Sequence, residues 1–328
     1  MSGREEEIRV KIHVAVAQIK PRKGDYKFNL ERVGDLFSQL EAEAPETDVL
    51  VLPETVLSGY FLEGGVREVA RTREQLFDDL LRTYRERVTR PGAVMDICLG
   101  FYEVGDSKYY NSAMYATLTA EKTEDRSQKS PQSWGLGGDT RHPIAQICHV
   151  HRKFFLPTYG VFDEKRFVSR GRSIQAFPSR FGTIAVLICE DVWHSITATI
   201  AALKGAQILF VISASPGREF TGQHLGNVTR WNVLLPGIAD EHNVWVVYAG
   251  LIGFEGGKGF TGSSQIIDPW GNPVVQGSVT EECIVRATID SEDVATARAV
   301  SPLLADLEAA LGDITMELEQ VARQPHIG

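Results

Sequence analysis

Short apolar runs that alternate with amphipathic helical segments are the feature that most constrains what this chain can fold into. The runs are rich in β-branched residues and end at turn-forming residues, which is typical of buried strands. Strands are predicted at 11–19, 47–53, 94–101, 110–119, 144–152, 183–189, 207–213, 244–250, 263–269 and 282–289. An alternation of this kind predicts an α/β fold.

Four segments carry apolar residues at the spacing of amphipathic helices. The first begins behind Asp25, a possible N-cap. The apolar faces consist of Leu30, Val33, Phe37 and Leu40; of Val66, Val69, Leu76, Leu80, Tyr84 and Val88; of Ile196, Ile200 and Leu203; and, in a closing helix at 301–323, of Leu303, Leu307, Leu311, Ile314, Leu318 and Val321. Because the sequence shows neither a repeat nor a break in composition, we expect one domain at 1–328, with its core at 11–290.

The segment 121–143 is polar and rich in serine, glycine and charge, so we expect a flexible insertion between two strands. It precedes a strand of nine residues, and such a strand is about 30 Å long. We therefore expect the insertion to lie far from any site at the other end of that strand.

Composition limits the class of protein. The 43 acidic and 34 basic residues give a formal net charge of −9, which predicts neither nucleic-acid nor anionic-membrane binding. No apolar run approaches the roughly 20 residues that span a bilayer, and the charged N-terminus lacks the apolar centre of a secretory signal. Cys98, Cys148 and Cys283 form no CxxC pair and are expected to be structural. We expect a cytoplasmic protein with reduced thiols.

Three reactive side chains stand where predicted strands end. Glu54 follows VLVLP, Lys153 follows AQICHVHR, and Cys189 closes TIAVLIC. In α/β folds the loops at strand ends converge and form ligand sites. Because these residues are far apart in the sequence, only the fold can bring them together.

The three residue types suit attack on an amide. A free thiol has a pKa of about 8.5; a cation such as Lys153 is expected to lower the pKa of Cys189, and Glu54 can accept its proton. Attack creates an oxyanion, which Lys153 and a backbone N–H can stabilise. The departing nitrogen needs a proton, which Glu54 can return.

The segments 51–60 (VLPETVLSGY), 151–167 (HRKFFLPTYGVFDEKRF) and 187–193 (LICEDVW) resemble, in order, the three signature stretches of the nitrilase superfamily. Within it they are most similar to the glutaminase domain of glutamine-dependent NAD synthetases. The segments 14–33 and 260–277 also resemble that domain, so the resemblance covers roughly 11–290.

The resemblance implies an αββα sandwich of the nitrilase type that associates into αββα–αββα dimers or a higher homo-oligomer. It implies a catalytic triad of Glu54, Lys153 and Cys189, supported by Glu164, with the backbone N–H of Glu190 in the oxyanion hole. The residues that it implies for the substrate pocket are Tyr60, Tyr159 and Trp193, with Ser213 and Ser215 as further candidates. Without the resemblance, the sequence around Glu164 is also typical of a charged surface residue, and the three aromatic residues are also typical of ordinary core packing.

Together these features predict a cysteine amidohydrolase that converts a small-molecule primary amide to a carboxylate and ammonia through a thioester, without a metal or organic cofactor. Alternatives are a nitrilase, an N-carbamoyl hydrolase, or an ammonia-supplying glutaminase subunit of a separate synthetase. Cys189 is not followed directly by the tryptophan usual in nitrilases, nor shortly by the arginine of carbamoyl hydrolases. An ATP-dependent synthetase domain does not follow within the 328 residues, so we do not expect NAD synthesis by this chain alone.

Two further patterns resemble functional motifs but stand in the wrong context, and a third motif is absent. The segment 257–262 (GKGFTG) matches GxGxxG but leads into a predicted strand, where a dinucleotide site needs a helix. Cys148, His149 and His151 lie on one predicted strand, so Cys148 is expected to face away from the histidines, which argues against a metal site. The sequence has no GxSxG serine motif.

Overall fold

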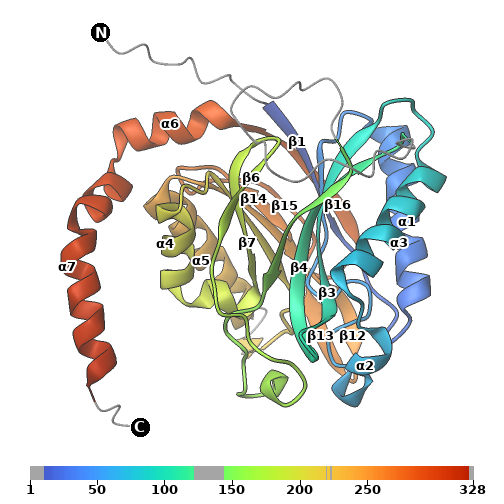
Figure 1. Cartoon of the computed structure of the whole chain (residues 1–328), viewed down its shortest axis with the longest axis horizontal. Coiled ribbons are helices and arrows are strands. Elements are labelled where there is room, and N and C mark those ends of the chain that lie inside the picture. Colours follow the sequence, from blue (N-terminus) through green and yellow to red (C-terminus); the bar gives the residue numbers. More distant parts are fainter. Residues whose placement is uncertain (1–10, 122–143, 219, 222–223, 325–328) are drawn as a thin grey trace.

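A computed structural model describes residues 11–121, 144–218, 220–221 and 224–324. Two β-sheets lie face to face between two pairs of helices (Figure 1). Helices α1 (Tyr26–Glu43) and α3 (Arg73–Arg87) cover the first sheet, and α4 (Ser195–Leu203) and α5 (Gly226–His242) cover the second. The expected α/β class and the αββα layering are therefore confirmed.

Each sheet has six strands and mixes parallel with antiparallel pairs. The first has the order β16 (Cys283–Asp290), β1 (Lys11–Gln18), β2 (Val49–Val51), β3 (Val94–Gly105), β4 (Lys108–Thr119) and β5 (Gln146–Arg152). The second has the order β15 (Pro273–Gln276), β14 (Gln265–Ile267), β11 (Trp245–Gly250), β8 (Ile208–Ser213), β7 (Gly182–Ile188) and β6 (Ala176–Ser179). Smaller pairs are β9 (Phe220–Thr221) with β10 (His224–Leu225), and β12 (Ile252–Glu255) with β13 (Lys258–Thr261).

Parallel pairing at the centre of each sheet sets where the reactive residues lie. In the first sheet β1, β2 and β3 run parallel, and in the second β7, β8 and β11 do. Residues that follow β2 and β7 therefore leave the carboxyl ends of central strands, where open sheets commonly bind ligands. The apolar faces between the sheets form one continuous core, and a second core lies beneath α1 and α3.

The helix predicted behind Asp25 is confirmed. The Asp25 carboxylate accepts a hydrogen bond from the backbone N–H of Phe28, and Val33, Phe37 and Leu40 of α1 are buried. The prediction of a single second helix was wrong, because α2 (Val66–Val69) ends at Val69 and a new helix, α3, begins behind Thr72. Thr72 and Gln75 cap α3 reciprocally, which fixes this separate start.

Two further helix predictions need correction. In α4 the buried face consists of Thr197, Ala198, Ala201 and Ala202, whereas Ile196 is 43% exposed. The small side chains allow α4 to lie close to β7, and larger ones are not needed there. Helix α5 was not predicted at all, since Gly226, Gly237 and Pro236 weaken its helical pattern. Its Trp231 and Leu235 are nevertheless buried in the main core.

The C-terminal region extends along one side of the sandwich as α6 (Ser291–Val300) and α7 (Leu303–Arg323) (Figure 1). Of the residues of α7, Leu304 is the one that is buried. Leu303, Leu311, Met316, Leu318 and Val321 are each at least 40% exposed, so the amphipathic helix leaves apolar side chains in contact with solvent.

The insertion predicted at 121–143 lies, beyond its first residue, outside the described residues. Within the described ranges, no helix has the length and apolar character to cross a membrane. Two short 3₁₀ segments, η2 (Glu164–Arg166) and η3 (Cys189–Trp193), carry residues of the candidate site, and a third, η1 (Glu63–Gly65), leads into α2.

Candidate active site

Glu54 leaves the first sheet just after β2 and is fully buried. The next residue, Thr55, has a φ of 51°, an uncommon left-handed conformation for a β-branched residue that turns the chain sharply. Gly100 on β3 allows this turn, because a Cβ there would lie 2.5 Å from Glu54 Cα and from the Thr55 backbone nitrogen. The Glu54 carboxylate is thus held rigidly against the sheet.

Lys153 lies between two carboxylates. Its Nζ donates to Glu54 Oε1 at 2.8 Å and to Glu164 Oε1 at 2.9 Å, and its side chain is fully buried. Asn111 Nδ2 donates to the same two oxygens, at 2.7 and 3.1 Å. The other oxygen of Glu54 accepts the backbone N–H of Ala214, which follows β8 of the second sheet, at 2.6 Å. The predicted Glu54, Lys153 and Glu164 therefore meet in one hydrogen-bonded cluster.

The cluster holds one cation against two anions. Burial disfavours the charged form of Lys153, yet Glu164 and Glu54 hold its pKa well above the ordinary value. Burial raises the pKa of Glu164 despite the opposing effect of Lys153. Lys153 is therefore a fixed ammonium group, and the two carboxylates share its charge.

Cys189 begins η3, directly after β7. Its φ of 48° is left-handed, which costs a non-glycine residue of the order of 1 kcal/mol and is found preferentially at functional turns. Ser213 Oγ, at the end of β8, donates to Cys189 Sγ at 3.2 Å. The thiol therefore stands at a sharp turn between two parallel strands.

Lys153 lowers the pKa of this thiol, as expected, but other effects outweigh it. Burial and the charge of Glu54 raise the pKa of Cys189 above that of a free thiol, and Lys153 lowers it by less. The physical reason is that Glu54 and Glu164 already neutralise the ammonium group. The resting residue is a neutral thiol, so its proton has to be removed when it reacts.

Asp191 joins the turn that carries Cys189 to the segment that carries Lys153. Its Oδ1 accepts the backbone N–H groups of Phe154 and Phe155, both at 2.9 Å. Its Oδ2 accepts the N–H of Ile188 at 3.1 Å and bonds His151 Nε2 at 2.8 Å. One buried carboxylate thus fixes the relative position of the two candidate catalytic residues.

The predicted pocket residues divide into an inner and an outer group. Tyr60 is buried, with Lys153 Nζ 5.7 Å from its ring centroid. Tyr159 is 45% exposed, and its hydroxyl bonds both carboxylate oxygens of Glu190, at 3.0 and 2.9 Å. Trp193 is half-buried and packs edge-on against Trp231, with ring centroids 5.6 Å apart.

Ser213 and Ser215 differ in what they contact. Ser213 bonds the thiol, as described, and is buried on β8. Ser215 Oγ accepts Asn227 Nδ2 at 3.2 Å, and its backbone carbonyl accepts the Thr261 backbone N–H and hydroxyl. Ser215 therefore ties the loop after β8 to β13 and to the start of α5.

Sequence reasoning missed Asn111 and Arg218. Asn111 had a signal, since an amide within the apolar strand at 108–119 needs partners. Arg218 had none: its guanidinium carbon lies 5.7, 5.1 and 5.3 Å from the ring centroids of Tyr159, Phe162 and Trp193. Its buried Nε has no hydrogen-bond partner among the described residues. A cation thus lies among the pocket aromatics.

The alternation predicted for Cys148, His149 and His151 was wrong. A β-bulge opposite Tyr115 and Ala116 leaves Cys148 as an extra residue. Cys148 Sγ therefore contacts Thr117 on the inner face, the face on which His149 stacks on Phe177. Within the described part of the chain, no three His, Cys, Asp or Glu side chains are grouped as a metal site would require. Cys98 is fully buried in the main core.

Residues 13–299 match the family described as carbon-nitrogen hydrolase. The chain is 26% identical over 285 residues to the glutamine-dependent NAD(+) synthetase of Thermotoga maritima, across 86% of this chain and 43% of that enzyme. It therefore spans less than half of the length of that relative. It is also 27% identical over 272 residues to the 2-oxoglutaramate amidase of Bacillus subtilis, across 83% of this chain and 89% of that protein.

Solved structures of other proteins have the same fold as this chain. A carbon-nitrogen hydrolase from Helicobacter pylori G27 superposes with a TM-score of 0.74 at 22% identity, covering 90% of this chain and 95% of that one. A mutant of the amidase from Nesterenkonia sp. AN1, in complex with acrylamide, superposes with a TM-score of 0.67 at 21% identity, covering 92% and 96% of the two chains.

Proposed function

Since the chain belongs to the carbon–nitrogen hydrolase family and is an enzyme of it, we propose that it is a cysteine amidohydrolase that converts a small-molecule primary amide to a carboxylate and ammonia. One observation carries the proposal: Lys153 bonds both Glu54 and Glu164 in a buried cluster, and Cys189 stands at a left-handed turn in the electrostatic range of that cluster. A nucleophile, a proton acceptor and a fixed cation are the groups that amide cleavage by a thiol needs.

In the first half-reaction, Glu54 removes the proton of Cys189 as Sγ attacks the amide carbon. The carbonyl oxygen becomes an oxyanion, which accepts hydrogen bonds from Lys153 and the Glu190 backbone N–H. Removing one such donor typically raises the barrier by about 3–4 kcal/mol. As the C–N bond breaks, Glu54 returns the proton to the nitrogen, and ammonia leaves a thioester on Cys189.

In the second half-reaction, Glu54 removes a proton from water, which attacks the thioester carbon. The C–S bond breaks, the carboxylic acid leaves, and the proton returns to Cys189. Glu164 keeps Lys153 oriented throughout, because it shares the ammonium group with Glu54. The neutral resting thiol fits this scheme, since the proton moves only when the nucleophile attacks.

The pocket rim favours a polar amide. Arg218 offers a cation among the aromatic rings, and Glu190 offers a carboxylate that Tyr159 orients. Groups of both signs suit a substrate with a charged end beyond its amide. Tyr60 and Trp193 supply apolar walls. Glutamine is therefore the first candidate substrate, and the relatives named above support an amide of this size.

The alternatives are testable against the same site. A nitrilase or N-carbamoyl hydrolase would use the same triad on a different carbon. A glutaminase subunit would pass its ammonia to a separate synthetase; the similarity to a glutamine-dependent NAD(+) synthetase supports a glutamine-cleaving role.

The test is an ammonia-release screen that includes glutamine, simple primary amides, matched nitriles and N-carbamoyl compounds, with Cys189→Ala as the blank. We expect the highest kcat/KM for a primary amide. A nitrile that exceeds its matching amide would overturn the amidase assignment, because a linear sp carbon does not mimic the planar amide. Activity that appears only with an added ATP-using partner would favour the glutaminase subunit.

We further propose that the chain is a single domain that works in the cytoplasm as a homodimer or higher homo-oligomer. The exposed apolar side chains of α7 support association, because such a face usually has a partner. Light scattering on the chain with and without α7 tests this, and a monomer in both cases would contradict it. The free cysteines support the compartment.

A further inference from the structure

A cleft of about 830 Å³ lies along β5, the strand at one edge of the first sheet. Four segments line it: the start of α3, the β3–β4 hairpin, β5 and the segment 170–173. Arg152 lies in this cleft, whereas the next residue, Lys153, belongs to the buried cluster. None of Glu54, Lys153, Glu164 and Cys189 lines the cleft, so it is distinct from the candidate active site.

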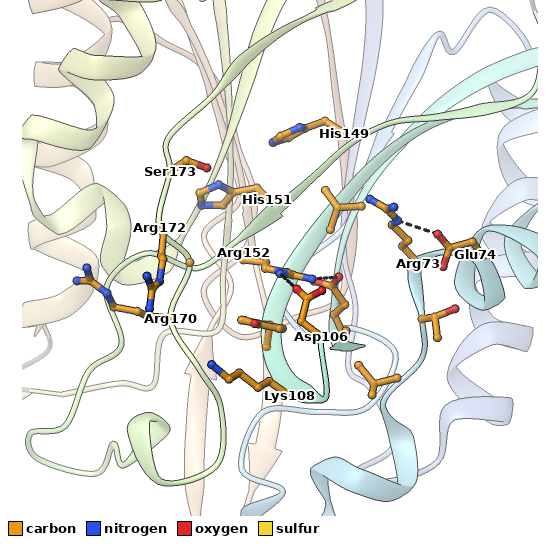
Figure 2. Close-up of a pocket in the computed structure, with 17 residues that line it drawn as sticks. Arg73, Glu74, Asp106, Lys108, His149, His151, Arg152, Arg170, Arg172 and Ser173 are labelled. Atoms are coloured by element: carbon orange, nitrogen blue, oxygen red, sulfur yellow. Dashed lines mark hydrogen bonds and ion pairs between the residues drawn. The ribbon is translucent and has the colours of Figure 1, made fainter. Parts of the chain in front are cut away.

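The cleft gathers cations in a chain whose formal net charge is −9. Its basic side chains are Arg73, Lys108, Arg152, Arg170 and Arg172, and its acidic side chains are Glu74, Glu103 and Asp106. Figure 2 shows Lys108, Arg170 and Arg172 to one side of Arg152, with Arg73 and Glu74 to the other.

The acidic side chains of the cleft are already engaged. Glu103 is buried and bonds Arg152 Nε and Nη2 at 2.9 and 2.8 Å, while Asp106 bonds Arg152 Nη1 at 2.7 Å. Glu74 pairs with Arg73 at 2.7 Å. These carboxylates hold two arginines in place and leave no carboxylate of the cleft for the other cations.

The remaining basic side chains of the cleft are exposed; they are those of Lys108, Arg170 and Arg172. None of the three has an ion-pair partner among the described residues, and Arg170 only stacks over Phe154, 5.1 Å from the ring centroid. The segment that carries the two arginines is fixed, since the Gly171 N–H donates to the Lys153 carbonyl at 2.7 Å. A Cβ at Gly171 would lie 2.0 Å from the Arg152 carbonyl oxygen, so only glycine allows this contact.

We propose that this cleft is a binding site for a small molecule that carries a di- or triphosphate. Three cations without carboxylate partners among the described residues match the charge of such a group, and guanidinium groups fit phosphate oxygens in paired hydrogen bonds. The volume is within the usual range for small-molecule sites. The shared chemistry is the phosphate chain, which either a nucleotide or inorganic polyphosphate supplies.

The test is calorimetric titration of the full chain at low ionic strength, where charge attraction is least screened. The probes are inorganic tripolyphosphate, ADP, AMP and citrate. We expect saturable binding of tripolyphosphate and ADP, and binding of AMP weaker by about tenfold, because each charge-assisted contact contributes about 1.4 kcal/mol or more. Tighter binding of ADP assigns a nucleotide, and tighter binding of tripolyphosphate assigns an inorganic chain. Citrate as tight as tripolyphosphate would overturn the phosphate assignment.

The variant Lys108→Ala, Arg170→Ala, Arg172→Ala should weaken binding by about a thousandfold, since three contacts of about tenfold each are lost. The matched control removes three exposed cations elsewhere, Lys11→Ala, Lys27→Ala and Arg67→Ala, and should bind within about twofold of wild type. Equal binding by both triple variants would overturn the site. If the first variant does not fold, Arg172→Gln alone should still weaken binding.

A final arm separates this site from the amidase. Protein alkylated at Cys189 should bind tripolyphosphate as the unmodified protein does, whether or not any amide is turned over. Loss of binding on alkylation would move the phosphate site into the Cys189 pocket and overturn the proposal.

Discussion

Two buried polar clusters, one around Lys153 and one around Asp191, both include residues of the segment 151–155. They differ in the partners of the charged group at the centre of each. The cluster around Lys153 holds one ammonium group against two carboxylates, beside a thiol whose pKa burial raises. The cluster around Asp191 holds one carboxylate, and each of its oxygens has two hydrogen-bond partners. The first can exchange protons, whereas the second fixes backbone. Chemistry and geometry are thus assigned to neighbouring but separate groups.

The largest effect is expected from the cation of the first cluster. Lys153→Ala should lower kcat by about 10³-fold or more, because it removes positive charge where the oxyanion forms. Lys153→Arg should fail nearly as badly, since a planar guanidinium cannot replace an ammonium group between Glu54 and Glu164. Steady-state kinetics on a primary amide measures both.

Lys204→Ala is the control for Lys153, since that lysine donates to the Ile174 carbonyl, outside the cluster. It should keep kcat, and circular dichroism should show that all three variants are folded. A Lys153→Arg enzyme of near-normal rate would contradict the role of an ammonium group held between the two carboxylates.

The second test concerns the thiol. Because burial raises the pKa of Cys189, the thiolate is a small fraction at pH 7 and increases about tenfold for each pH unit up to that pKa. The rate at which methyl methanethiosulfonate modifies Cys189 should therefore rise about a hundredfold from pH 7 to pH 9. Peptide mass mapping follows Cys189, and Cys189→Ala gives the background. A rate that is already constant by pH 7 would mean that the cluster does stabilise a thiolate, as its sequence had suggested.

The third test addresses the second cluster. Asp191→Asn keeps the shape but replaces one acceptor oxygen by a donor, so two of the four partners lose their bonds. We expect kcat to fall about ten- to thirtyfold and the melting temperature to fall by a few degrees, since an unsatisfied buried donor costs about 1–3 kcal/mol.

Asp96→Asn is the matched control for Asp191. Asp96 is also fully buried and accepts hydrogen bonds from Tyr115 and Arg180, outside both clusters. It should lower the melting temperature but leave kcat within about twofold, as expected of a distant site. Equal losses of kcat in both variants would show that Asp191 stabilises the fold without positioning Cys189.

The contrast between the two clusters also explains which features of the site could be predicted from the sequence. Glu54, Lys153 and Cys189 each stand at the end of an apolar strand, but it was the three motifs resembling the nitrilase signature stretches, taken together, that selected them. Their protonation was not predictable, because it depends on Glu54 and Glu164 meeting at one nitrogen of Lys153, a long-range contact. Asp191 was visible as a letter in CEDVW, but its four hydrogen bonds come from segments that only the fold brings together.

Fold predictions failed where local chemistry outweighed periodicity. Strands with strong β-branched patterns were found, but the bulge at Cys148 has no marker in the sequence and reversed the expected facing of that residue. Thr72 and Gln75 form a capping box that divides one apolar pattern into two helices. Arg218 follows a strand end without any periodic signal, and only the pocket aromatics around it indicate its importance.

The smallest effect on the kinetic constants is expected at the rim of the pocket, where the residues belong to neither cluster. Tyr159→Phe removes the hydroxyl that bonds Glu190 but keeps the ring, which is 45% exposed. A hydrogen bond of this kind contributes about 0.5–1.5 kcal/mol, so KM for the preferred amide should rise about threefold while kcat changes less than twofold. Tyr26→Phe removes a comparable hydroxyl, bonded to Asp79 far from the site, and should leave both constants unchanged. If Tyr159→Phe lowers kcat more than tenfold, the rim takes part in the chemistry, and the division between the two clusters and the pocket around them would have to be redrawn.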